Sequence, residues 1–67
     1  MDDNYRCSME DYENPFPSMT IRASDPRRAA SFYKLEVSSK GGKPGNIVVS
    51  YQQERMLFSW ELKELHR

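Results

Sequence analysis

The 67-residue sequence has one cysteine and one histidine, and no run of consecutive apolar residues is longer than three. A single cysteine excludes an intrachain disulfide, and Cys7 with His66 falls short of the four ligands of a structural zinc site. A bilayer crossing needs roughly 20 apolar residues, so no membrane span is expected. The N-terminal residues are acidic where a secretory signal would be basic. These absences predict a cytoplasmic protein that needs no cofactor.

Groups that carry out catalysis are also scarce. The only base suited to activating a serine or cysteine, His66, lies next to the C-terminal residue, where chains fray. The three glycines, Gly41, Gly42 and Gly45, match neither a dinucleotide-binding fingerprint nor a phosphate-binding loop. We therefore expect no enzymatic activity and no small-molecule substrate.

The formal net charge of zero hides an uneven distribution of charge along the chain. Residues 1–21 contain five carboxylates and one arginine, whereas residues 22–43 contain six basic and two acidic side chains. Scattered charge of this kind usually serves solubility, but an acidic segment followed by a basic one also fits an electrostatic binding surface.

Two segments with different patterns divide the chain. Residues 1–17 are acidic, and Pro15 and Pro17 force an extended path on either side of Phe16. We therefore predict a mobile, aromatic-containing arm over 1–17 and a single small domain over 18–67.

Alternating apolar residues predict three strands within this domain, over 19–23, 33–37 and 47–52. Asp25 followed by Pro26 is typical of a helix start, which predicts a short helix over 25–30. The segment 39–46 contains three glycines and a proline, so we expect it to close a hairpin between the second and third strands.

The C-terminal segment allows two interpretations. Residues 54–65 have the composition of a helix, but Met56, Phe58, Trp60 and Leu62 alternate as in a strand, and we choose the strand. The predicted fold is α+β: a small antiparallel sheet of three to four strands with one short helix. Its inward-facing residues are expected to be Met19, Ile21, Tyr33, Leu35, Val37, Ile47, Val49, Tyr51, Met56, Phe58, Trp60 and Leu62.

On these strands Phe32, Val48 and Leu57 would point away from the core. The outer face of a one-sided sheet is normally polar, so either the short helix covers these residues or another molecule does. The leading hypothesis is a non-catalytic accessory or inhibitor protein that acts by occluding a surface of a larger protein or by forming a homodimer. Phe32, Val48 and Leu57 would form its interface, with Tyr5, Tyr12 and Phe16 as a second contact.

The alternative hypothesis is a small nucleic-acid-binding module. Its contacts would be Arg22, Arg27, Arg28, Lys34 and Lys43, because cations beside aromatic residues such as Phe32 and Tyr33 are typical of single-strand binding surfaces. The balanced net charge argues against this alternative, since dedicated nucleic-acid binders are usually basic.

Overall fold

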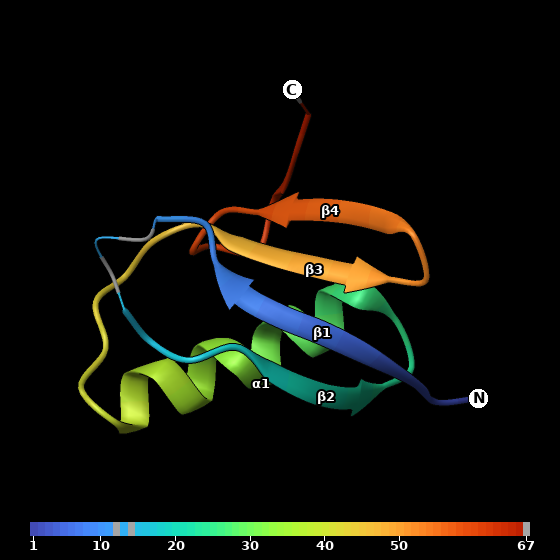
Figure 1. Ribbon diagram of the computed structural model, residues 1–67, viewed down its shortest axis with the longest axis horizontal. Helices are drawn as coiled ribbons and strands as arrows, with labels where there is room; N and C mark the ends of the chain where they lie inside the picture. Colours follow the sequence, from blue (N-terminus) through green and yellow to red (C-terminus); the bar gives the residue numbers. More distant parts are fainter. Residues whose placement is uncertain (12, 14, 67) are drawn as a thin grey trace.

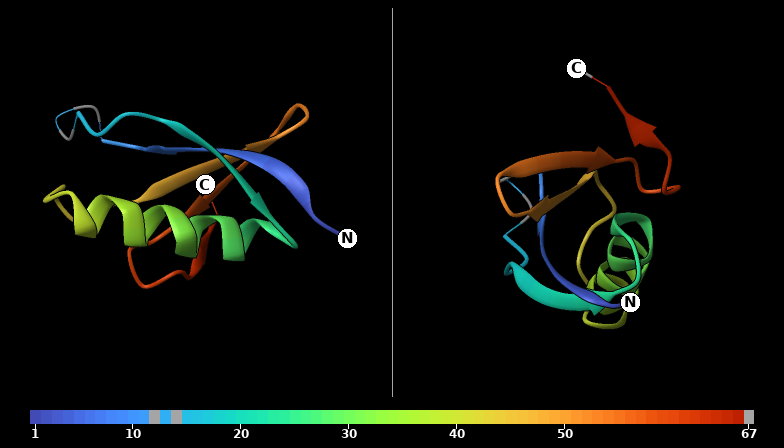
Figure 2. Two further views of the ribbon diagram at one scale, coloured as in Figure 1. Left: turned by 90° about the horizontal axis from the view of Figure 1, so that it is seen from below. Right: turned by 90° about the vertical axis from the view of Figure 1, so that its right-hand side faces the viewer.

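The computed structural model describes residues 1–11, 13 and 15–66, which form a five-stranded antiparallel sheet with one helix packed on one face (Figures 1 and 2). The elements are β1 (Asp3–Met9), β2 (Met19–Ala23), α1 (Pro26–Ser39), β3 (Ile47–Tyr51), β4 (Glu54–Phe58) and β5 (Glu64–Leu65). The strand order is β2-β1-β3-β4-β5, so α1 connects two strands that lie on either side of β1. The predicted α+β class is confirmed, with five strands where three to four were expected.

The N-terminal segment is the largest departure from prediction. Residues 3–9 are not part of a mobile arm but form β1, which pairs with β2 on one side and with β3 on the other. Tyr5, Cys7 and Met9 point into the core, while Asn4 and Arg6, which alternate with them, are exposed. This is the period of two typical of a half-buried strand. The acidic composition and the prolines that follow obscured it.

Helix α1 begins as predicted but is much longer than expected. The Asp25 carboxylate accepts a hydrogen bond of 2.8 Å from the Arg28 backbone N–H, and Pro26 occupies the first turn. The helix continues to Ser39 because Ala30, Tyr33 and Val37 recur at helical spacing and are all buried. The strand predicted over 33–37 is therefore wrong.

The glycine-containing segment ends this helix and does not close a hairpin. The Gly41 N–H donates to the Ser38 carbonyl and the Gly42 N–H donates to the Val37 carbonyl, a pair of bonds typical of a Schellman cap. Gly41 has a φ of 76°, which favours glycine. A Cβ on Gly42 would lie 2.5 Å from Cγ1 of Val37, so the side chain of Val37 also requires glycine there.

The strands predicted over 19–23 and 47–52 are present as β2 and β3. The strand predicted through 56–62 ends at Phe58. Ser59 to Lys63 then form a turn, in which the Leu62 N–H donates to the Ser59 carbonyl and Leu62 has a φ of 66°. The chain returns as β5, which pairs with β4, so the helical alternative over 54–65 is not observed.

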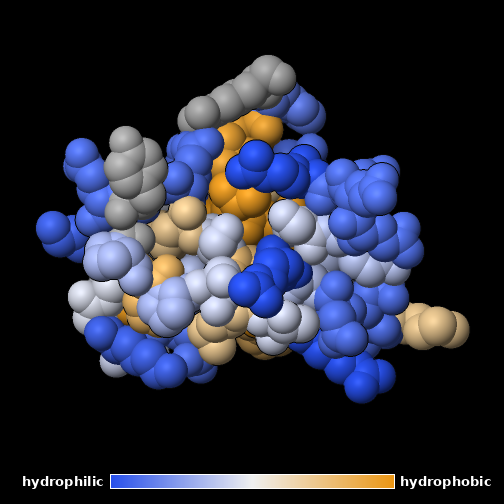
Figure 3. Space-filling model, in the orientation of Figure 1, coloured by the Kyte–Doolittle hydropathy of each residue, from blue (hydrophilic) through white to orange (hydrophobic). Residues whose placement is uncertain are grey.

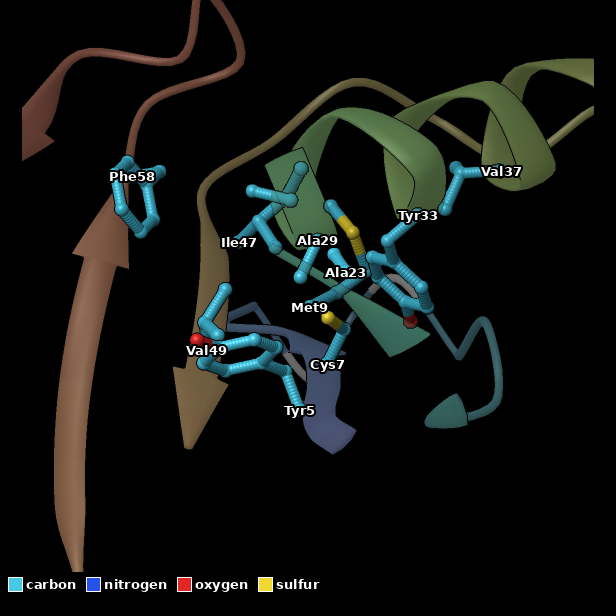
Figure 4. Packing of buried hydrophobic residues seen from close by; sticks show 11 residues of the cluster. Tyr5, Cys7, Met9, Ala23, Ala29, Tyr33, Val37, Ile47, Val49 and Phe58 are labelled. Atoms are coloured by element: carbon cyan, nitrogen blue, oxygen red, sulfur yellow. The ribbon is translucent and has the colours of Figure 1, made fainter. Parts of the chain in front are cut away.

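The core lies between α1 and the sheet, as Figure 4 shows. The most deeply buried large side chains are Tyr33, Ile47, Val37, Val49 and Cys7. One residue of the predicted inward set departs clearly from this arrangement. Leu35 is 63% exposed, because its position on a helix points it away from the sheet.

Candidate interaction surface

The three apolar residues predicted to point outward, Phe32, Val48 and Leu57, lie on two opposite sides of the molecule. Phe32 belongs to α1, whereas Val48 and Leu57 are cross-strand neighbours on β3 and β4. Val48 and Leu57 alternate with the buried residues Val49 and Phe58, so they occupy the sheet face that α1 leaves uncovered. They cannot form one continuous surface with Phe32.

The apolar residues on the uncovered sheet face form a row across three strands. Val48 is paired in register with Leu57, and Leu57 is paired with Leu65. Figure 3 shows an apolar area on this face, close to the C-terminal end of the chain. Val48 is only 6% exposed and Leu57 is partly buried, so much of this row is covered by the chain itself. A shallow depression of about 440 Å³ lies along it, lined also by Glu10, Arg55, Glu64 and His66.

The solvent-facing side of α1 is the more open apolar surface. Phe32 is 49% exposed and Leu35 is 63% exposed, and among the described residues the only other strongly exposed large apolar side chain is Met1. Positions separated by three residues are neighbours on a helix, so Phe32 and Leu35 lie side by side. We call these two residues, together with the exposed Arg28 and Ser39 and the partly exposed Ser31 and Glu36, the α1 outer face.

Charged pairs border the two apolar residues along the helix. Arg28 lies 3.4 Å from a carboxylate oxygen of Asp25, and Lys40 lies 3.3 Å from a carboxylate oxygen of Glu36. Both pairs are largely exposed and contribute little to stability, so their side chains can reorient at small cost. The α1 outer face thus has an apolar centre and a charged rim.

Contacts at both ends and along one side hold α1 in place. The Asp25 and Gly41–Gly42 caps fix its ends. The Lys34 ammonium donates a hydrogen bond of 2.6 Å to the Trp60 carbonyl and lies 5.1 Å from the centre of the Trp60 ring. The α1 outer face is therefore a rigid surface.

The aromatic residues predicted as a second contact have other roles. Tyr5 is buried, and its ring centroid lies 5.0 Å from that of Tyr51. Phe16 packs edge-on against Tyr33 at 5.8 Å, beside the hydrogen bond from the Tyr33 hydroxyl to the Pro17 carbonyl. Tyr12 lies outside the described residues. Tyr5 and Phe16 thus complete the core of the domain.

The five basic residues of the alternative hypothesis are spread over the molecule. Arg22 is exposed on β2, and Arg27 and Arg28 lie in the first turn of α1. Lys43 follows the other end of that helix, which is about 21 Å long at 1.5 Å per residue. Lys34 is directed toward Trp60. This arrangement does not gather the five cations into one patch.

The titratable groups in the core are held in their neutral forms. Burial raises the pKa of the Cys7 thiol to about 11, the opposite of the shift that activates a cysteine nucleophile. Burial also raises the pKa of Tyr33. Within the described ranges, no three His, Cys, Asp or Glu side chains come together where they could hold a metal ion. In the same part of the chain, no helix has the length and apolar character that a membrane crossing needs.

Neither family models, curated proteins nor solved structures gave a match to this chain. The α1 outer face is the most exposed apolar surface among the described residues.

Proposed function

We propose that this chain is a small non-catalytic protein-binding module that uses the α1 outer face to cover a surface of another protein molecule. The observation that carries this proposal is the exposure of Phe32 and Leu35, side by side on a well-capped helix. An accessory or inhibitory protein of this kind acts by occupying an interface, so it needs no catalytic group.

The energetics favour burial of these two residues by a partner. Full burial of such a side chain from water is worth roughly 1.5 to 3 kcal/mol. Because Phe32 is 49% and Leu35 is 63% exposed, about half of that free energy remains for a partner to supply at each residue.

The rigidity of α1 supports the same function. Binding costs less when the contacting side chains are already held on an ordered element. The two end caps and the Lys34–Trp60 contact provide that order before any partner arrives.

The test compares two variants as bait for proteins from a lysate of the source cells. The double variant Phe32→Ser and Leu35→Ser removes the apolar centre of the α1 outer face, and Leu57→Ser is the matched control on the opposite sheet face. We expect the unaltered chain and the control to capture a protein partner that the double variant does not capture. This difference should be the same whether or not the lysate is treated with nuclease.

Equal capture by all three proteins would refute the proposal. Capture that disappears with nuclease, and that weakens steeply between low and moderate salt, would favour the nucleic-acid alternative. Circular dichroism of each variant establishes that it is folded before the comparison is made.

A further inference from the structure

The α1 outer face consists of two parallel rows of residues spaced four apart. One row is Arg28, Phe32 and Glu36, and the other is Ser31, Leu35 and Ser39. Each row therefore has a large apolar residue at its centre. Rows of this spacing are the ridges that pack into grooves at the commonest helix crossings.

The first row has opposite charges at equal distances from its centre. Arg28 precedes Phe32 by four residues and Glu36 follows it by four, which places each charge about 6 Å from Phe32 along the helix axis. If two such helices cross antiparallel at Phe32, Arg28 of each copy faces Glu36 of the other. A symmetric dimer requires this kind of self-complementarity, in which one contact is made twice.

The second row supplies space for the crossing. Ser31 and Ser39 have small side chains on either side of Leu35, so a facing helix can approach closely at these two positions. Leu35 is the most exposed apolar residue of the helix and would pack beside the small serine side chains of the facing copy.

We propose that the partner of the α1 outer face is a second copy of this chain, bound through an antiparallel α1–α1 contact centred on Phe32. This inference rests on the proposed function and specifies its partner. The pattern of charges favours a second copy, because an antiparallel crossing lets Arg28 and Glu36 exchange their weak, exposed partners in the same chain, Asp25 and Lys40, for each other at two contacts. A single pair of crossing helices is a small interface, below about 1,200 Å², so the dimer dissociates on dilution.

The experiment is sedimentation velocity over a range of protein concentrations, with two charge-reversal variants studied separately and mixed. In Arg28→Glu, both charges of the row are negative, and in Glu36→Arg both are positive. Each variant alone should dimerise about tenfold more weakly than the unaltered chain, because both contacts across the dimer become repulsive.

An equimolar mixture of the two variants restores opposite charges at both contacts. We therefore expect the mixture to form a heterodimer at least as readily as the unaltered chain forms its homodimer. Phe32→Ser should abolish association of either kind. Circular dichroism and Trp60 fluorescence show whether each variant keeps its fold.

Three results would overturn the inference: a chain that stays monomeric at every concentration, charge variants that dimerise unchanged, or a mixture that shows no recovery. The proposed function fails separately, when the double variant at Phe32 and Leu35 captures the same proteins as the unaltered chain. A monomer that still binds another protein through the α1 outer face therefore disproves the dimer and leaves the proposed function standing.

Discussion

The side chain of Lys34 on α1 holds the turn between β4 and β5 through Trp60. Its ammonium group donates a hydrogen bond of 2.6 Å to the Trp60 carbonyl while lying 5.1 Å from the centre of the indole ring. One cation thus makes two favourable contacts with one residue. It joins the helix to a segment with which the helix makes no backbone hydrogen bond in the described part of the chain.

Lys34→Met should release this turn and lower the free energy of unfolding by about 1 to 2 kcal/mol, since it removes a charged hydrogen bond and a cation–π contact. The control is Lys40→Met, which removes an exposed lysine that pairs with Glu36 on the same helix. Urea titration followed by Trp60 fluorescence measures both. An equal effect of the two substitutions would contradict the structural role of Lys34.

Gly42→Ala should destabilise the protein by about 1 to 3 kcal/mol, because the added Cβ would lie 2.5 Å from the buried Val37 side chain. Gly45→Ala is the matched control, since its Cβ meets only the flexible end of Met9, at 3.0 Å. Thermal unfolding of both variants gives the comparison. A larger loss at Gly45 than at Gly42 would show that the helix end is not packed as described.

The stability of the protein should fall as the pH rises from about 9 to 11. The unfolded Cys7 thiol loses its proton near its ordinary pKa of 9.0, but burial raises the pKa of the folded thiol to about 11. In this window the unfolded chain binds fewer protons than the folded one, so alkali favours unfolding by up to about 2 to 3 kcal/mol.

The check for this pH effect is urea unfolding at several pH values for the unaltered chain and for Cys7→Ala. The variant should be less stable at neutral pH, because it leaves a small cavity, but its stability should depend less steeply on pH between 9 and 10. Identical slopes for the two proteins would contradict the raised pKa. Tyr5, Tyr33 and Tyr51, whose pKa values are also raised, act in the same direction above pH 10 in both proteins.

Removal of residues 1–11 should unfold the domain. Those residues include β1, which lies between β2 and β3 and contributes Tyr5, Cys7 and Met9 to the core. If these residues were a mobile arm, their removal would leave the fold intact. Circular dichroism of the truncated chain therefore distinguishes a mobile arm from a structural strand. A cooperative unfolding transition in the truncated chain would refute the role assigned to β1.

The parts of the fold that could be predicted from sequence are those specified by local signals. β2 and β3 have clear alternation, and Asp25–Pro26 marks the helix start through a side chain and a ring that act within one turn. The residues from Tyr33 to Val37 were ambiguous because positions 33, 35 and 37 alternate while positions 30, 33 and 37 follow a helix. The helix is favoured because it buries Tyr33 against the sheet. This contact joins residues far apart in the sequence, so local patterns could not predict it.

The choice between strand and helix over residues 33–37 also explains why only one of the two exposed apolar residues of α1 was predicted to point outward. The sequence predicts Phe32 to point outward, and it is half exposed, but on a helix and not on a strand. The sequence places Leu35 in the core, because a strand would point it to the same side as Tyr33 and Val37. A helical wheel drawn from Pro26 to Ser39 would have placed Leu35 opposite Val37 and shown both members of the apolar pair.

The position of β1 also constrains how the chain folds during synthesis. β1 is made before the other strands of this domain, but its neighbour β3 is made about forty residues later, as the pairing of Cys7 with Val49 shows. A nascent chain can form the β1–β2 hairpin early, yet the edge of β1 that pairs with β3 stays unpaired until residue 51 has been made. Slower translation of residues 47–51 would lengthen the time for which this edge of β1 is open to pairing with other chains.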